Sequence, residues 1–269
     1  MNIINQEVQN ITQTDFSYEG IMKFVERVGR ICYNSTDKIT KNSWKKFIEM
    51  LRTNKHYSPF GLATVHLKMN YTAWMAILDN VTRPEYRNYG GTKYDETTHT
   101  LYVTLSARII EEQDLWEIVK KYIDKDPCEY YPKRSTVYCT TSIAVSRELN
   151  RHKYLSTMEK STRYTECFDI IKPYWYDDAF DKEFVIDNKN FPCMIYEQCC
   201  ENSFKKYNQL IEIGLKKQEA RGVLPLDTVT NVIYTAYDLQ WKDVFEKRLV
   251  SGAHPDCKKL VSLIKSKIF

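Results

Sequence analysis

Apolar residues recur at spacings of three and four along several segments of the chain, which is the period of an amphipathic helix. The clearest of these segments cover residues 16–32 and 43–51, and Ser43 has the side chain of an N-cap residue. Further helices are predicted over residues 114–122, 143–150 and 191–215, and from Asp238 as N-cap to Leu249.

Alternating apolar and polar residues predict strands in other segments. In residues 63–69, Val65, Leu67 and Met69 alternate with His66 and Lys68, which predicts a strand. The run 56–61, His-Tyr-Ser-Pro-Phe-Gly, is predicted as a loop. Other strands are expected over residues 101–105, 135–141 and 227–235.

The helical and strand segments are interspersed, and no repeat or low-complexity linker divides the chain. With 269 residues the chain can bury one large core. We therefore predict an α+β fold: a single domain over residues 1–269 with a central mixed or antiparallel sheet flanked by helices. Residues 79–97 are polar and contain Pro and Gly-Gly, so an inserted excursion is expected at about 75–130.

Composition excludes several classes of protein. Hydrophobic residues are 43% and charged residues 28% of the chain, which argues against disorder, collagen and a coiled-coil rod. No apolar run reaches the ~20 residues that span a bilayer, and the first ten residues lack the basic and apolar regions of a signal peptide, so a cytoplasmic protein without membrane partners is expected. A net charge of +4 is too small to indicate nucleic acid. The 8 cysteines form no C-x-x-C pair and are expected to be reduced, mostly buried thiols without zinc.

The stretch 147–163 holds five basic residues against two acidic ones, and hydroxyl side chains lie between the charges. Guanidinium groups match the geometry of phosphate oxygens, and hydroxyls add short donors beside them. A solvated basic loop is the alternative, but Tyr154, Leu155, Met158 and Tyr164 make the segment half apolar. The pattern favours a site for a small phosphorylated ligand.

Two further arginines stand near apolar residues, and their roles stay open. Arg221 fits either a ligand contact or an ion pair with a helix-end carboxylate. Arg248 closes a predicted helix, where a cation interacts favourably with the helix C-terminus. His56 and His254 lack partners at metal-binding spacing, so no metal site is expected. The chain has no Ser-His-Asp signature, no G-x-G-x-x-G and no P-loop.

Several motifs together resemble the flavin-dependent thymidylate synthases, the ThyX family. Arg151-His152-Lys153, seven residues and Ser161, followed by Arg163-Tyr164, is similar to the family signature Arg-His-Arg, seven residues, Ser. Further similar stretches follow the family order over nearly the whole chain: Gly29–Ser35, His56-Tyr-Ser-Pro, Ala220-Arg221-Gly-Val-Leu-Pro, and Arg248 with Ala253-His254-Pro255.

The chain also departs from the family pattern. Lys153 replaces the second arginine of the signature, which keeps the charge and loses the forked donors. Glu148 stands where many members have Gln beside the nucleotide, and Gly61-Leu62 replaces a common Glu-His. Where many members place Asn, Arg, and Asn or His around the flavin, this chain has Tyr237, Leu239 and Asp243.

The resemblance implies an activity: conversion of dUMP to dTMP, with methylenetetrahydrofolate as carbon donor and with FAD, reduced by NADPH, as hydride donor. It also implies a homotetramer with shared active sites, in the cytoplasm of a bacterial or virus-infected cell. Two alternatives stay open, namely a relative that makes another modified pyrimidine nucleotide and a non-catalytic nucleotide-binding protein that has lost flavin.

The resemblance further implies roles for single residues. Arg248 would face the uracil as the catalytic cation, and Arg221 would reach the nucleotide from a neighbouring subunit. The other implied dUMP contacts are Glu148, Arg151, Glu159, Lys160, Ser161, Thr162 and Arg163. The implied FAD contacts are His56, Ser58, Arg151, His152, Lys153, Glu159, Tyr237, Leu239 and Asp243.

Overall fold

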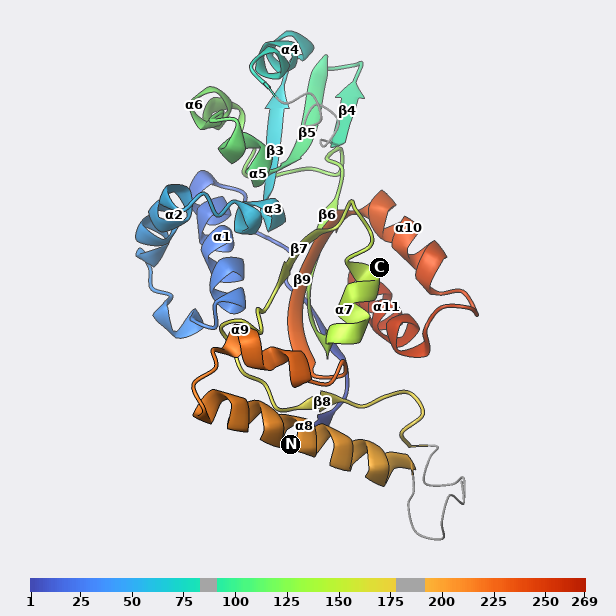
Figure 1. The fold of residues 1–269 in the computed structure, drawn as a ribbon. Helices are drawn as coiled ribbons and strands as arrows, with labels where there is room; N and C mark the ends of the chain where they lie inside the picture. The colour runs from blue at the N-terminus through green and yellow to red at the C-terminus, as the bar shows by residue number, and fades with distance from the viewer. Residues whose placement is uncertain (83–90, 178–191) are drawn as a thin grey trace.

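A four-stranded antiparallel sheet forms the centre of the fold (Figure 1). The computed structural model describes residues 1–82, 91–177 and 192–269. The strand order is β2-β6-β9-β7, so the two long strands are central and the two short ones lie at the edges. The strands are β2 (Glu7–Asn10), β6 (Arg134–Ser142), β9 (Val229–Tyr237) and β7 (Ser156–Glu159). The central antiparallel sheet and the α+β class are confirmed.

Each face of this sheet is covered by helices. On one face Val137, Val232 and Tyr234 are buried in a cluster with Trp241 and Leu260. The helices of that cluster are α7 (Ile143–Leu149), α10 (Asp238–Arg248) and α11 (Pro255–Ile268). The helices that lie across the other side are α1 (Tyr18–Cys32), α2 (Ser43–Thr53) and α3 (Ser58–Leu62).

A second sheet of order β3-β5-β4 lies at one end of the molecule, and the segment predicted as an excursion supplies β4 and β5 but not β3 (Figure 1). Val65 and Val103 of this sheet share one hydrophobic cluster with Val25 and Phe60, and Ile233 of the central sheet joins it. This cluster thus connects the second sheet to the central one. Residues 83–90, part of the polar stretch predicted as an excursion, lie outside the described residues. The elements are β3 (Thr64–Met69), α4 (Tyr71–Asp79), β4 (Gly91–Asp95), β5 (Thr100–Ser106), α5 (Ala107–Glu112), α6 (Trp116–Val119) and a 3-10 turn (Lys120–Tyr122).

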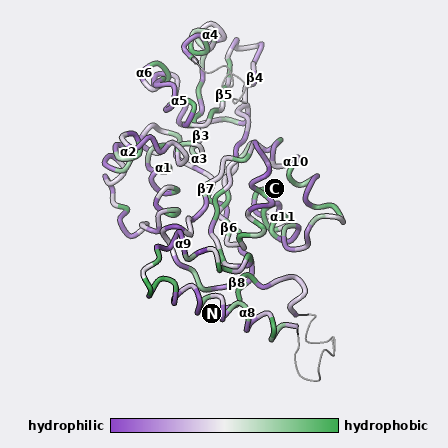
Figure 2. Tube along the Cα trace, viewed as in Figure 1, coloured by the Kyte–Doolittle hydropathy of each residue, from purple (hydrophilic) through white to green (hydrophobic). Residues whose placement is uncertain are grey.

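The opposite end carries β1 (Ile3–Ile4), which pairs in parallel with β8 (Ile170–Ile171), and the long helix α8 (Pro192–Glu212). The helix packs over Ile170 through Cys200 and Phe204. Hydrophobic and hydrophilic residues are mixed along each drawn helix (Figure 2). Within the described ranges, no helix is both long and apolar enough to cross a membrane. The remaining short elements are α9 (Lys217–Ala220) and 3-10 turns at Thr36–Lys38 and Arg221–Val223.

Three local predictions were wrong. The run 56–61 is not a loop throughout, because α3 begins at Ser58 with Pro59 in its first turn, where the fixed φ of proline suits a helix. Ser43 and Asp238 are the first residues of their helices, and Asn42 and Tyr237 precede them as N-caps. The predicted helix 114–122 is a single α-turn followed by a 3-10 turn.

His66, within the strand predicted over residues 63–69, is only 5% exposed. Its Nδ1 lies 3.0 Å from the Thr104 hydroxyl, and its ring packs against Phe16 and Tyr131. Burial lowers the pKa of His66 to about 4. Both faces of β3 are therefore buried at this position. Five of the eight cysteines are buried, which confirms that part of the cysteine prediction.

Candidate active site

The basic stretch folds into the end of α7, a turn and the edge strand β7. Ser142 caps α7 by accepting a hydrogen bond from the backbone of Val145. β7 then pairs with β9, with Glu159 opposite Val232. Leu155 is buried beneath the turn, whereas Tyr154 and Tyr164 are each 66% exposed. A segment fixed in a sheet in this way is not a free solvated loop.

Glu159 is held by three side chains of the central sheet and α7. Its Oε1 accepts hydrogen bonds from the Ser146 hydroxyl at 2.8 Å and the Thr230 hydroxyl at 3.0 Å. Its Oε2 accepts a bond from the Asn150 amide at 3.3 Å. The carboxylate is thereby fixed at the end of β7. Sequence patterns did not single out these three partners, because polar residues at such positions carry no periodic signal.

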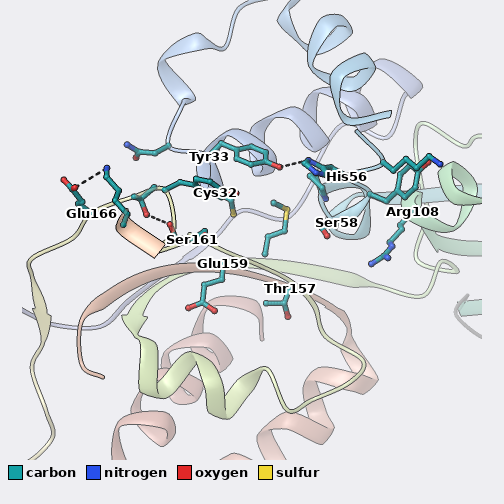
Figure 3. Close-up of a pocket in the computed structure, with 17 residues that line it drawn as sticks. Cys32, Tyr33, His56, Ser58, Arg108, Thr157, Glu159, Ser161 and Glu166 are labelled. Atoms are coloured by element: carbon teal, nitrogen blue, oxygen red, sulfur yellow. Dashed lines mark hydrogen bonds and ion pairs between the residues drawn. The ribbon is translucent and has the colours of Figure 1, made fainter. Parts of the chain in front are cut away.

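On one side of Glu159 lies a cavity of about 860 Å³, here called the signature pocket (Figure 3). It brings together His56, Ser58, Glu159 and Ser161, four residues that the motifs had selected from distant parts of the chain. The Tyr33 hydroxyl lies 3.3 Å from Nδ1 of His56. The other lining residues that bear on its chemistry are Cys32, Arg108, Thr157, Tyr164, Glu166 and Lys217.

On the other side of Glu159, a cavity of about 610 Å³ is lined by Lys160, Ser161, Thr162 and Arg221. We call it the Arg221 pocket. Arg221 Nη1 donates to the Thr162 hydroxyl at 3.3 Å within the same chain. The expectation that Arg221 reaches the site from a neighbouring subunit is therefore not needed for this contact. Arg147 also lines this pocket.

Arg163 does not point into a described pocket. Its Nη2 donates to the Gln218 side chain at 3.2 Å, and its guanidinium lies 5.3 Å from the centre of the Tyr164 ring. Arg163 is exposed. Its side chain stands next to Thr162 in the loop after β7, so it is within reach of a ligand at Ser161 and Thr162 by rotation about its own bonds.

Each of the three nitrogens of the Arg248 guanidinium donates a hydrogen bond to a neighbouring group. Nη1 and Nη2 donate to the carboxylate and the backbone carbonyl of Glu148, both at 2.7 Å. Nε donates to His152 Nε2 at 3.0 Å, so that nitrogen is the acceptor and the ring proton is assigned to Nδ1. Burial, and next the charge of Arg248, lower the pKa of His152.

The remaining predicted flavin residues are divided among different surroundings. Asp243 forms an ion pair with Lys247 at 2.7 Å and lies 4.0 Å from His152 Nδ1. The Tyr237 hydroxyl accepts from the backbone of Gly91 and donates to the carbonyl of Thr104, so it joins the two sheets. Leu239 is 78% exposed and lines none of the cavities described here. Arg151 is 72% exposed at its side chain, 3.9 Å from Glu148.

A second cavity of about 610 Å³, the junction pocket, lies between the excursion and the central sheet. It adjoins the signature pocket in that Ser58, Arg108 and Thr157 line both. His152, Lys153 and Tyr237 face this cavity, together with Arg134 at the start of β6. Sequence reasoning missed both Arg108 and Arg134. Neither belongs to a motif, and only the packing of the excursion brings them near Lys153.

Comparisons with known proteins bear on this arrangement. The family model described as "Thymidylate synthase complementing protein" matches residues 133–268, which are 136 of the 269 residues. A flavin-dependent thymidylate synthase of Thermosipho africanus (strain TCF52B) is 32% identical over 111 residues, which are 37% of this chain and 47% of the relative. One of Aquifex aeolicus (strain VF5) is 21% identical over 294 residues, with 91% of this chain and 93% of the relative covered. The chain thus spans about half the length of the Thermosipho relative and most of the Aquifex one.

Among solved structures, a UMP/dUMP methylase PolB from Streptomyces cacaoi aligns with 99% of this chain and 91% of its own, at 16% identity and a TM-score of 0.44. The family model covers the signature segment, Arg221 and Arg248. The match to half of the chain confirms the resemblance, and the chain belongs to the family of the thymidylate synthase complementing protein, the flavin-dependent thymidylate synthases.

Proposed function

We propose that the protein converts dUMP to dTMP, with methylenetetrahydrofolate as carbon donor and with FAD and NADPH supplying the hydride. The observation that carries this proposal is the position of the signature segment. Its Glu159 and Ser161 lie at the boundary of two cavities, one lined by Thr162 and Arg221 and one lined by His56 and Ser58. A nucleotide and a flat cofactor can therefore meet at Ser161.

The nucleotide phosphate is assigned to the Arg221 pocket. Arg221, Ser161 and Thr162 offer a guanidinium and two hydroxyls within one wall, and charge-assisted hydrogen bonds of this kind are the strong ones. Arg163 and Lys160 add positive charge at its edge. The fixed carboxylate of Glu159 lines this pocket and the signature pocket, and it suits a donor such as a ring N–H rather than a phosphate. The base is therefore assigned to the boundary of the two pockets.

The flavin is assigned to the signature and junction pockets. Ser58 and Thr157 line both pockets, His56 lines the first, and His152 and Lys153 line the second. These residues fit the group because they offer ring nitrogens, a hydroxyl and a cation. When bound, FAD supplies the hydride that completes the methyl group.

Arg248 is assigned to the pyrimidine on the resemblance. Within one chain it lines a separate cavity with Arg151, His152 and Lys153, and neither the signature pocket nor the Arg221 pocket, so this assignment requires the shared sites of the proposed tetramer. Negative charge develops on the ring as C5 becomes nucleophilic, and a fixed cation stabilises that charge most when water is excluded. The Arg248 side chain is only 18% exposed. Glu148 and His152 position its guanidinium. Glu148 is therefore a competitor of the nucleotide for this arginine.

We further propose a homotetramer acting in the cytoplasm, in which the binding of folate and NADPH completes the site. Sedimentation of the purified protein tests the assembly. A tetramer is expected, and a fully active monomer would contradict it.

The test of function is spectroscopic. The purified protein is titrated with FAD, and dUMP is then added while flavin absorbance and fluorescence are recorded. Bound flavin whose spectrum responds to dUMP, but not to deoxyuridine at the same concentration, is the expected result, because the phosphate contacts drive binding. A protein that binds dUMP and no flavin would instead be a non-catalytic relative.

A further inference from the structure

Three cationic side chains line the junction pocket, and of these Arg108 is paired with Glu112, which does not itself line the cavity. The other two are Arg134 and Lys153, and the lining within the described ranges includes no carboxylate. The signature pocket and the Arg221 pocket differ in this respect, because Glu159 lines both. A cavity lined by one sign of charge concentrates ions of the opposite sign. The junction pocket therefore favours an anionic group.

The guanidinium of Arg134 is buried, so its charge is unfavourable unless an anion lies nearby. It is 7% exposed, and its Nη atoms donate to the carbonyls of Gly61 and Ala63 and to the hydroxyls of Thr64 and Ser156. All four acceptors are neutral. The ring of Tyr237, 5.8 Å from the guanidinium carbon, adds a weak cation–π contact. A buried charge without a counter-ion is unfavourable, and an anion in the adjoining cavity would offset that cost.

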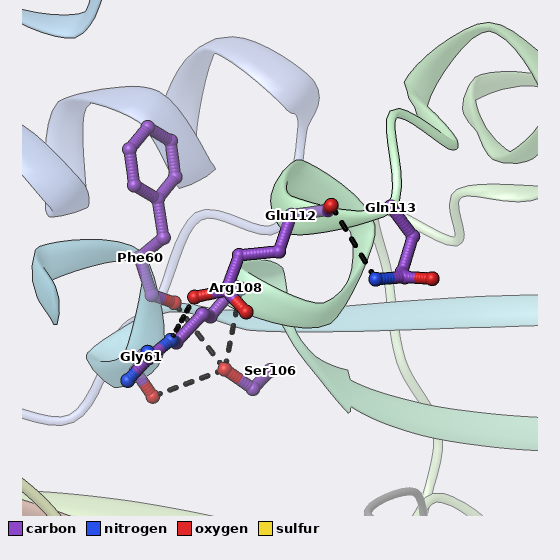
Figure 4. A network of polar contacts seen from close by, with 6 residues as sticks. All are labelled: Phe60, Gly61, Ser106, Arg108, Glu112 and Gln113. Carbon is purple, nitrogen blue, oxygen red and sulfur yellow. Dashed lines mark hydrogen bonds and ion pairs between the residues drawn. The ribbon is translucent and has the colours of Figure 1, made fainter. Parts of the chain in front are cut away.

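Arg108 provides a second cation whose donors remain available. Its Nε donates to Glu112 at 2.6 Å, and among the described residues this is the hydrogen bond its guanidinium makes. Figure 4 shows Arg108 extending from α5 toward Gly61, beside the hydroxyl of Ser106 that bonds to the Phe60 and Gly61 carbonyls. The side chain is 47% exposed, so its Nη groups can reach a ligand in either adjoining pocket.

We propose that Arg108, Arg134 and Lys153 bind the diphosphate of a dinucleotide cofactor in the junction pocket. This inference rests on the proposed function, and it assigns the excursion a role: through Arg108 it supplies part of the cofactor site. Two of the proposed cofactors carry a diphosphate, FAD and NADPH. Both share the chemistry that guanidinium groups recognise, with paired oxygens that accept forked donors.

Arg108→Gln is the variant that tests the proposal. It removes a charge from an exposed helix position, whereas Arg134→Met also removes four hydrogen bonds and is used only if its circular dichroism and melting temperature remain near those of the native protein. The matched control is Arg52→Gln. Arg52, in α2, pairs with Glu111 of α5, the helix that carries Arg108. Its side chain is 41% exposed, and it lines none of the described pockets.

Affinities are measured by fluorescence titration with FAD and riboflavin, and with NADPH and reduced nicotinamide mononucleotide. Arg108→Gln is expected to weaken the binding of FAD at least about tenfold, because it removes a hydrogen bond between charged groups. The affinity for riboflavin should stay unchanged. Arg52→Gln should change neither. If the binding of NADPH weakens while that of FAD does not, the diphosphate in this pocket is that of the nicotinamide cofactor.

The proposal is overturned if Arg108→Gln binds both dinucleotides as tightly as the native protein does. It is also overturned if the affinity for each dinucleotide falls by the same factor as the affinity for its analogue without the diphosphate. Failure of the proposed function gives a different result. In that case the native protein binds neither FAD nor riboflavin at any salt concentration, and no variant is needed to see it.

Discussion

Replacing Glu148 by Gln tests whether the nucleotide must compete for Arg248. The change keeps the shape of the side chain and removes its negative charge. It also leaves the bond from Arg248 Nη2 to the Glu148 carbonyl and the bond from Nε to His152 intact. What is weakened is a single charge-assisted contact, Nη1 to Oε2 at 2.7 Å, between side chains 18% and 30% exposed.

A hydrogen bond to a charged group contributes ~1.5–3 kcal/mol, and a neutral amide retains part of it. We therefore expect the Gln variant to hold Arg248 less tightly by about 1–2 kcal/mol. If dUMP draws Arg248 away from Glu148, the same amount appears as tighter nucleotide binding, a gain of roughly 5–30-fold. The loss of a carboxylate from the same positively charged region acts in the same direction.

Calorimetric titration of dUMP into the native protein and Glu148→Gln measures this gain. Glu111→Gln is the control, because Glu111 also holds an arginine by a bidentate pair, Nε at 2.6 Å and Nη2 at 2.9 Å, but does so in the excursion. Both variants should melt at a lower temperature, and only Glu148→Gln should bind dUMP more tightly. Unchanged or weaker dUMP binding by Glu148→Gln would refute the competition.

Three further outcomes follow from the same contacts. Arg163→Ala should weaken dUMP roughly tenfold to hundredfold and leave deoxyuridine nearly unchanged, because a charge-assisted phosphate contact contributes ~1.5–3 kcal/mol; equal losses in calorimetry would place Arg163 elsewhere. Arg248→Lys should lower kcat and kcat/KM together by ~10²–10³ while stopped-flow reduction of bound flavin by NADPH continues, and collapse of that reduction would assign Arg248 to the cofactor. Burial lowers the pKa of His66 to about 4. The unfolded chain therefore takes up this proton first, and stability present above pH ~6.5 should fall as the pH falls toward 4, by on the order of 3 kcal/mol. In His66→Gln, thermal melting at each pH should show a smaller decline, and an identical decline would contradict the assignment.

The parts of the fold that follow from local patterns were predictable. The helix over 16–32 and the strand over 227–235 have periodic apolar residues, and each is present as α1 or β9 with small shifts of its ends. His66 was not predictable in this way. Its burial depends on Phe16 and Tyr131, which reach it from distant parts of the chain.

The candidate site shows the same division. Ser161 and Glu159 belong to one continuous motif, and the structure finds them on one wall. The pairing of Arg248 with Glu148 joins residues 100 positions apart, and a charge pattern within one helix cannot reveal it. Arg134 could not be predicted for a further reason. It is held by backbone carbonyls, which every residue has, so the sequence does not distinguish it from any other arginine at the end of a strand.

The product of the reaction tests the central claim most directly. The protein is incubated with dUMP, methylenetetrahydrofolate, NADPH and FAD, and nucleotides are identified by mass spectrometry, with each component omitted in turn. The account predicts dTMP, formed only when all four are present. A hydroxymethylated nucleotide, or unchanged dUMP from a protein that demonstrably binds both dUMP and flavin, would contradict it.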